Sequence, residues 1–184
     1  MKLSNTPGVE ELVVIDNAIK KEEFDKIKNI ILSNEFDWHL IKNFVDNQED
    51  AEVLCNKFNN YKFVHMMFSS KNFYNEKNNY IWSSIFKILA VKALVRIKVN
   101  LTMNTNQIVK HGWHCDNNPV DFFPQLRSAI YYLNTCDGYT EFKHNNEKIY
   151  SKENRLIVFP NHFIHTGTTT TNELARYVVN FNFY

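Results

Sequence analysis

The stretch LVRIKVNLTM, from Leu94 to Met103, alternates apolar and polar residues over its whole length. Successive side chains of a β-strand point to opposite faces, so this strand would have one apolar face and one polar face. The two sets are Val95, Ile97, Val99 and Leu101 on one face, and Arg96, Lys98, Asn100 and Thr102 on the other. The alternation therefore predicts a β-strand.

Shorter runs of the same kind continue to the end of the sequence. They are SAIYYLN, YTEF, RLIVFP and RYVVNFNFY, with the turn-forming stretches NTCDGY and SKEN between some of them. Several short strands separated by turn signals are typical of a β-sandwich or β-barrel. We therefore expect a mainly β fold flanked by helices.

Two helices are predicted in the first half of the chain. Residues 21–34 place Phe24, Ile27 and Ile31 at helical spacing, and acidic residues lie early in the segment, where they suit the helix dipole. Residues 79–93 repeat an apolar face with the spacing of a half-buried helix. These helices would pack against the β core.

Residues 12–16 and 61–68 have the composition of strands. A chain of 184 residues has the size of one domain with a sizeable core. We expect a single domain over residues 1–184, in which residues 1–93 support a core formed by residues 94–184.

Composition excludes several functional classes. The formal net charge of +1 provides no global field for a polyanion, so nucleic acid is a disfavoured partner. The three cysteines, Cys55, Cys115 and Cys136, follow no disulfide spacing, and the first residues lack the apolar core of a signal peptide. No segment approaches the roughly 20 apolar residues that span a bilayer. These features predict a cytoplasmic protein without membrane insertion.

The stretch HGWHCDNN contains His114 and Asp116, two positions apart. In an extended segment they would face the same side, with Cys115 facing away. Alone, a His-x-Asp pair is weak evidence and is more often a structural or surface feature. A metal site needs a third ligand from elsewhere in the chain.

The stretch NRLIVFPNHFIHTG supplies two candidates, His162 and His165, just after an apolar strand. Two imidazoles and one carboxylate on one face of a metal leave positions open, the arrangement of non-haem Fe(II) enzymes. The cysteine spacing does not support a closed structural zinc site.

Arg176 begins the last strand, RYVVNFNFY. If the apolar face of this strand packs against the helices, Arg176 points into the barrel. A buried guanidinium is costly unless an anion meets it, and its planar fork suits a carboxylate. The alternative is an Arg paired with Asp or Glu at the barrel rim.

The order of HCD, AIYYLN, GYTEF, NRLIVFPNHFIHTG and a following Arg resembles the Fe(II)/2-oxoglutarate-dependent oxygenases, in particular their prolyl-4-hydroxylase-like branch. It is most similar to small, mostly uncharacterised members from marine bacteriophages, for which the compartment would be the host cytoplasm. The resemblance covers residues 94–184. It implies a double-stranded β-helix core, of the jelly-roll and cupin-like type, and a dioxygenase that hydroxylates an unactivated C–H bond while converting 2-oxoglutarate to succinate.

The resemblance also implies roles for individual residues. His114, Asp116 and His165 would bind Fe(II), and Arg176 and Tyr132 would bind the distal carboxylate of 2-oxoglutarate. O2 would be the second cosubstrate, with ascorbate as a candidate reductant. Halogenating relatives lack the carboxylate ligand, so Asp116 favours hydroxylation.

Two other histidines would not be ligands. The family places its ligand where His165 lies, so His162 is excluded, and His111 would be a strand residue or part of the rim. Trp113, Asn117, Asn118 and residues 121–127 would face the substrate or form a solvated loop.

The substrate is less defined by these motifs. Many prolyl hydroxylases have a Tyr on the strand before the His-x-Asp motif, whereas here Asn100, Thr102 or Met103 would line that region. Asn182 occupies the position of a second Arg in the nucleic-acid-repairing relatives, which disfavours a nucleobase. A peptidyl proline or another amino-acid side chain leads, followed by free small molecules and nucleotides.

Two non-enzymatic alternatives remain. One is a cupin-like β-helix protein that binds metal without oxygenase activity, and the other is an interaction module with an oxygenase fold. The cupin-like protein would not need Arg176 together with Tyr132, and the interaction module would not need the intact set of His114, Asp116 and His165.

Overall fold

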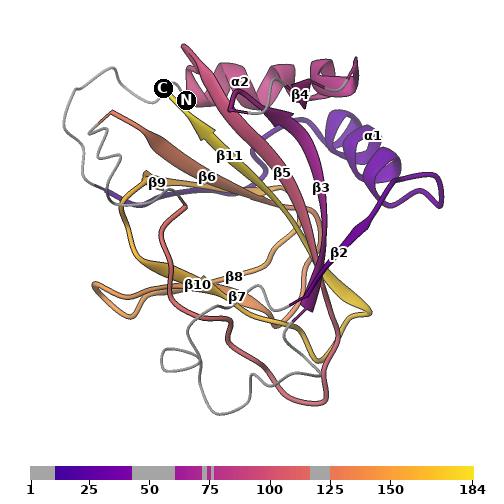
Figure 1. Cartoon of the computed structure of the whole chain (residues 1–184), viewed down its shortest axis with the longest axis vertical. Helices are drawn as coiled ribbons and strands as arrows, with labels where there is room; N and C mark the ends of the chain where they lie inside the picture. The colour runs from indigo at the N-terminus through magenta and orange to yellow at the C-terminus, as the bar shows by residue number, and fades with distance from the viewer. Residues whose placement is uncertain (1–10, 43–60, 72–73, 76, 117–124) are drawn as a thin grey trace.

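The computed structural model describes residues 11–42, 61–71, 74–75, 77–116 and 125–184. No helix within these ranges is long and apolar enough to cross a membrane. The architecture is mainly β, with two antiparallel sheets and two α-helices (Figure 1).

The larger sheet has eight strands, and all of its pairings are antiparallel. Its order is β1 (Val13–Ile15), β9 (Arg155–Pro160), β6 (Arg127–Tyr132), β11 (Ala175–Phe183), β5 (Leu94–Met103), β3 (Tyr61–Ser69) and β2 (His39–Lys42), and β4 (Tyr74–Asn75) pairs with β3. The strand predicted from the opening stretch is confirmed at both ends. It pairs with β11 along its whole length, from Met103 opposite Ala175 to Leu94 opposite Phe183.

The smaller sheet has three antiparallel strands in the order β10 (His165–Gly167), β7 (Tyr139–Phe142) and β8 (Lys148–Tyr150). Side chains from both sheets share one apolar cluster. From the larger sheet come Ile130, Tyr132, Ile157, Phe159 and Val178, and from the smaller sheet come Phe142 and Ile149. The two sheets therefore pack face to face, as the predicted double-stranded β-helix requires.

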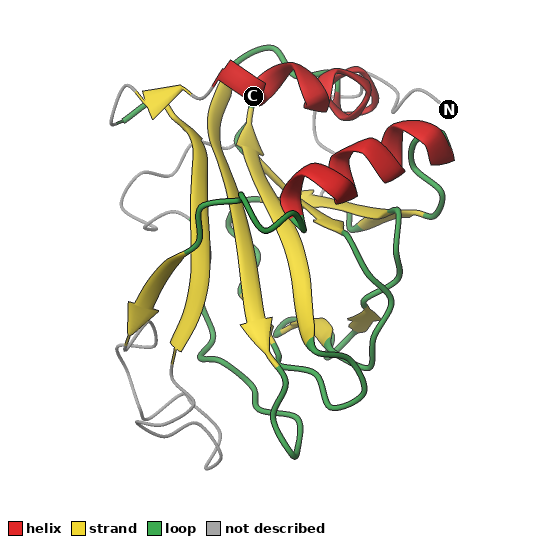
Figure 2. Ribbon diagram, turned by 90° about the vertical axis from the view of Figure 1, so that its right-hand side faces the viewer, coloured by secondary structure: helices red, strands yellow, loops and turns green. Residues whose placement is uncertain are grey.

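The helices α1 (Lys21–Ile31) and α2 (Ser83–Leu89) cover the other face of the larger sheet (Figure 2). A 3-10 helix, η1 (Lys77–Trp82), leads directly into α2. Trp82 is fully buried and meets Phe181 of β11 edge to face at 5.2 Å between ring centroids. Val179, Phe181 and Phe183 lie in this helix-side cluster. The prediction that the apolar face of the last strand packs against the helices is confirmed.

The element boundaries differ from prediction at the helix ends. The second helix ends at Leu89 rather than near residue 93, because Ala90 adopts a left-handed conformation with φ 51° and stops the helix. The first helix ends at Ile31 rather than Asn34. The short strands β1 and β7 were predicted, whereas the similarly short β2, β4, β8 and β10 were not.

Candidate metal centre

His114 and His165 are paired through the backbone. The amide of each donates a hydrogen bond to the carbonyl of the other, at 3.0 and 2.9 Å, which forms an isolated antiparallel bridge. His165 is the first residue of β10, while His114 lies in the segment that follows β5. Paired residues present their side chains to the same face, and the two imidazole centroids lie 4.6 Å apart.

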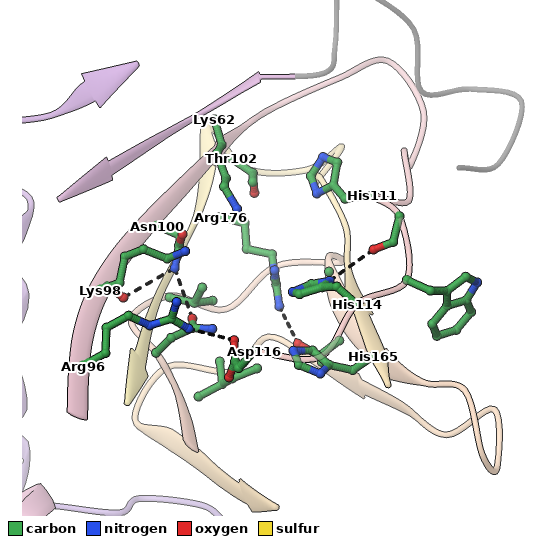
Figure 3. A pocket seen from close by; sticks show the side chains of 17 residues that line it. Lys62, Arg96, Lys98, Asn100, Thr102, His111, His114, Asp116, His165 and Arg176 are labelled. Atoms are coloured by element: carbon green, nitrogen blue, oxygen red, sulfur yellow. Dashed lines mark hydrogen bonds and ion pairs between the residues drawn. The ribbon is translucent and has the colours of Figure 1, made fainter. Parts of the chain in front are cut away.

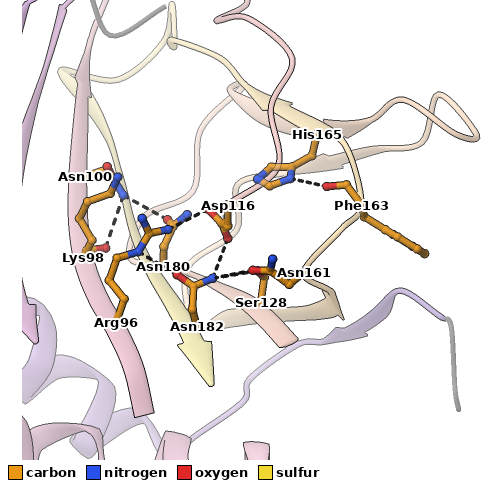
Figure 4. A network of polar contacts seen from close by, with 10 residues as sticks. All are labelled: Arg96, Lys98, Asn100, Asp116, Ser128, Asn161, Phe163, His165, Asn180 and Asn182. Atoms are coloured by element: carbon orange, nitrogen blue, oxygen red, sulfur yellow. Dashed lines mark hydrogen bonds and ion pairs between the residues drawn. The ribbon is translucent and has the colours of Figure 1, made fainter. Parts of the chain in front are cut away.

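Asp116 completes a cluster with these two histidines. One potential ligand atom from each of the three residues lies within 4.8 Å of the others. The carboxylate is held from two sides: Nη2 of Arg96 donates to Oδ1 and Nδ2 of Asn182 donates to Oδ2, both at 3.0 Å (Figure 4). Each carboxylate oxygen can accept more than one contact, so a metal ligand position remains.

Both imidazoles are oriented by backbone carbonyls. Nδ1 of His114 lies 3.2 Å from the carbonyl oxygen of Gly112, and Nδ1 of His165 lies 2.9 Å from that of Phe163. With Nδ1 donating to a carbonyl, Nε2 carries the lone pair that a metal needs. This pattern is the usual outer support of metal-binding histidines.

The protonation states also suit a metal. The surrounding protein atoms and the neighbouring His165 lower the pKa of His114 to about 4, although its side chain is open to solvent, so its ring is neutral at pH 7. Burial raises the pKa of Asp116, but Arg96 and the two histidines outweigh this effect and the net pKa lies below its ordinary value. A neutral imidazole and an ionised carboxylate are the forms that bind divalent iron.

The cluster opens into a cavity of about 390 Å³ between the two sheets (Figure 3). Its lining consists of Lys62, Arg96, Lys98, Asn100, Thr102, His111, Gly112, Trp113, His114, Asp116, Ile130, Thr140, His165, Gly167, Arg176, Val178 and Asn180. Volumes of about 300–1,000 Å³ are typical of small-molecule sites.

Arg176 enters the same cavity from β11 and is only 4% exposed. Its Nε donates to Ser151 Oγ at 2.7 Å, and its Nη2 donates to Thr140 Oγ1 at 2.9 Å. No carboxylate among the described residues pairs with it, so the rim ion pair considered as an alternative is not seen there. A buried guanidinium held by two hydroxyls can receive a carboxylate from a ligand.

Gly138 provides the space for this side chain. A Cβ at Gly138 would lie 2.6 Å from Cδ of Arg176 and 2.6 Å from the carbonyl oxygen of Thr169. Tyr132 lies beside the same guanidinium, which stands 5.5 Å from its ring centroid. Its hydroxyl donates to Thr140 Oγ1 at 2.9 Å, and Tyr132 does not itself line the cavity.

The remaining histidines lie outside the cluster. His162 is exposed on the turn before β10. His111 is buried and lines the cavity, and burial lowers its pKa to about 3. His65 contacts the carbonyl oxygen of Asp37 through Nδ1 at 2.6 Å, as expected for a structural histidine.

Trp113, Asn100 and Thr102 line the cavity, whereas Met103 does not. Asn117, Asn118 and residues 121–124 lie outside the described residues.

Sequence reasoning did not identify the contacts of Arg96 and Asn182 with Asp116, or the cations Lys62 and Lys98 in the cavity. The alternation of Leu94–Met103 contained the signal, because its polar face is the one that borders the cavity.

Comparison with known proteins adds to this geometry. Residues 101–184 match the family described as the 2OG-Fe(II) oxygenase superfamily. Among curated protein sequences, no relative matches the chain.

Solved structures with the same fold include three informative neighbours. A prolyl hydroxylase from Trichoplax adhaerens, solved with a peptide of the hypoxia inducible factor oxygen degradation domain, has a TM-score of 0.62 and 13% identity, covering 95% of this chain and 84% of that one. The viral collagen prolyl hydroxylase of Paramecium Bursaria Chlorella virus-1, in its 2OG complex, has a TM-score of 0.58 and 15% identity, covering 95% and 98%. The nogalamycin-biosynthesis epimerase SnoN has a TM-score of 0.60 and 10% identity, and the match covers 95% of this chain and 78% of that one. At these identities the likeness establishes the fold.

A double-stranded β-helix with two histidines and a carboxylate facing its internal cavity defines the class of non-haem iron enzymes. The region that carries these ligands, residues 101–184, is the part of the chain that matches the 2OG-Fe(II) oxygenase superfamily. Fe(II) and 2-oxoglutarate are the cofactor and cosubstrate that this family implies.

Proposed function

We propose that this chain is an Fe(II)- and 2-oxoglutarate-dependent dioxygenase that hydroxylates an unactivated C–H bond and releases succinate. One observation carries the proposal: the cluster of His114, Asp116 and His165 shares a single cavity with the buried Arg176. A protein that only bound a metal would have no use for a guanidinium held without an acidic partner beside that metal.

His114, Asp116 and His165 are the proposed iron ligands. Their donor set, their Nε2 lone pairs and the ionised carboxylate support this assignment. Three ligands on one side leave room for the cosubstrate on the other. When bound, the metal and 2-oxoglutarate supply the oxidising power of the reaction.

Arg176 is the proposed anchor for the distal carboxylate of 2-oxoglutarate. Ser151 and Thr140 orient its guanidinium through Nε and Nη2. Tyr132 is proposed as a second donor to the same carboxylate, for which its hydroxyl proton would turn from Thr140 Oγ1 to the ligand. Fixing both ends of the cosubstrate would orient its reacting end.

The rest of the cavity would position the substrate and limit access of water. Residues 94–184 provide the proposed ligands and anchor, and residues 1–93 are the proposed support region, although β3 also contributes Lys62 to the cavity.

Two substrate classes suit this enzyme. The likeness to prolyl hydroxylases supports a peptidyl proline or another amino-acid side chain, and the cavity of about 390 Å³ has room for a free small molecule. A nucleobase is disfavoured because Asn182, in place of the second Arg of repair enzymes, holds Asp116 instead. Ascorbate as a reductant stays a prediction.

An anaerobic titration tests the proposal. The apoprotein is titrated with Fe(II) and then 2-oxoglutarate, and the visible absorption band of an iron-chelated 2-oxo acid is recorded. Appearance of the band, and its loss in Asp116→Ala, is the expected result. Metal binding without the band would instead identify a cupin-like metal-binding protein that is not an oxygenase.

A further inference from the structure

Positive charge dominates the cavity beyond the groups that the proposed function uses. Four cationic side chains line it: Lys62, Arg96, Lys98 and Arg176. Among the described lining residues, Asp116 is the single carboxylate. Fe(II) and the 2-oxoglutarate dianion cancel each other, so loading the cosubstrate leaves this excess in place.

Two of these cations already have roles. Arg96 is paired with Asp116 at 3.0 Å and also donates from Nε to Asn182 Oδ1 at 2.8 Å. Arg176 is the proposed anchor of 2-oxoglutarate. The iron would take the other carboxylate of the cosubstrate, so the cosubstrate has no need of Lys98.

Lys98 extends from β5 toward the interior of the cavity (Figure 3). Its ammonium makes no hydrogen bond or ion pair with a described residue. Burial and the positive charge of Arg96 lower its pKa to about 8, and burial with Lys98 and Arg96 lowers that of Lys62 to about 7. Holding the Lys98 ammonium in such a place costs free energy that an anion bound to it would offset.

Asn100, next on the same face of β5, indicates a second group that a bound substrate would carry. It is 7% exposed, and its Nδ2 donates to Asn180 Oδ1 at 3.1 Å. Its Oδ1 is buried and has no hydrogen-bond partner among the described residues. A buried acceptor without a partner is costly, so a ligand that offers an N–H or O–H donor there gains affinity.

Resting on the proposed function, we propose that the substrate is a small carboxylic acid that also carries a hydrogen-bond donor, the class of free amino acids and hydroxy acids. Lys98 binds its carboxylate, and Asn100 Oδ1 accepts from its amine or hydroxyl. The cavity of about 390 Å³ suits such a molecule beside 2-oxoglutarate. In the reaction, one atom of O2 enters the substrate as hydroxyl and the other enters succinate, with release of CO2.

The experiment measures succinate release in the presence of 2-oxoglutarate and paired test compounds. Each pair consists of a free amino or hydroxy acid with four to six carbons, for example L-proline, and the primary carboxamide of that acid. Lys98→Met removes the charge while keeping the aliphatic stem, and Lys98→Arg restores the charge. Lys87→Met, on the exposed side of α2, is the matched control.

We expect acids to stimulate succinate release and their carboxamides to fail. Lys98→Met should raise the half-saturating acid concentration about tenfold or more, because a hydrogen bond to a charged group is lost. The same variant should leave the 2-oxoglutarate dissociation constant within about twofold of wild type, since separate sites behave independently. Lys98→Arg should recover much of the effect, and Lys87→Met should match wild type.

Three results would overturn the proposal while leaving the dioxygenase intact. Carboxamides could stimulate as well as acids, or a proline-containing peptide could stimulate where no acid does. Lys98→Met could also weaken 2-oxoglutarate as much as the acid, which would assign the lysine to the cosubstrate. Absence of the 2-oxo acid band in wild type would instead contradict the proposed function itself.

Discussion

His114 and His165 exchange both of their backbone hydrogen bonds, so two imidazoles from distant parts of the sequence are fixed on one face, 4.6 Å apart. This bridge links the segment after β5 to the first residue of β10. The spacing of the two proposed ligands is therefore set by the backbone, before any metal binds.

His165→Ala should abolish tight Fe(II) binding, because two remaining ligands hold iron poorly. His162→Ala is the matched control, three positions earlier in sequence but exposed and outside the cluster. Equilibrium dialysis against Fe(II) under anaerobic conditions compares them. Iron retained by His165→Ala, or lost by His162→Ala, would show that the wrong histidine has been assigned.

Arg96→Met should weaken Fe(II) binding about tenfold to a hundredfold, because Arg96 orients the carboxylate of Asp116. Arg155→Met serves as control, since it removes a different Arg–Asp pair, with Asp16, outside the cavity. The measurement compares the Fe(II) dissociation constants of the two variants. Equal values would remove Arg96 from the support of the metal centre.

Arg176→Met should weaken 2-oxoglutarate about thirtyfold or more while leaving iron affinity near wild type, because a buried charge pair is lost. The titration of the chelate band with 2-oxoglutarate measures the change. Arg176→Lys should be intermediate, since it keeps the charge but not the planar fork. An unchanged cosubstrate affinity in Arg176→Met contradicts the assignment.

Gly138→Ala should also weaken 2-oxoglutarate, although Gly138 does not line the cavity. Its new Cβ would meet Cδ of Arg176 at 2.6 Å and force the side chain to move. Gly167→Ala should be milder, because its Cβ would approach only Nη1 of Arg176, at 3.3 Å. The ranking of the two cosubstrate dissociation constants, with thermal unfolding to check folding, tests this geometry.

The stability of the apoprotein should rise as pH increases from about 7 to about 10. Burial lowers the folded-state pKa of Lys98 to about 8 and of Lys62 to about 7, from an ordinary 10.5. In that range the unfolded lysines bind protons that the folded lysines have released, so stability increases with pH. Arg96, from β5, and Asp116 are the charged groups that act on this pair, with His111 nearby and neutral.

Denaturant unfolding of the metal-free protein at both ends of this range measures the effect. Lys98→Met should show a smaller rise than wild type, whereas Lys87→Met should show the same rise. A rise of equal size in Lys98→Met would mean that other groups cause it.

Much of the fold could be predicted because the relevant signals are local. The alternation of Leu94–Met103 extends over ten residues and identified β5 to the residue. The apolar face of β11 and the helical spacing of Phe24, Ile27 and Ile31 are equally local. The short strands β2, β4, β8 and β10 were missed because backbone pairing, rather than side-chain pattern, defines them.

The same division applies to the site. The sequence by itself determined the candidate donor set, because His114, Asp116 and Arg176 are readable from residue type and order, and the resemblance to a known family selected His165 over His162. Only the tertiary structure decided that these groups share one cavity. It also decided that Arg96 and Asn182 hold Asp116, and that Lys62 and Lys98 line the same cavity. These relations depend on which strands pair and in which register, and contacts between strands distant in sequence have no local signature.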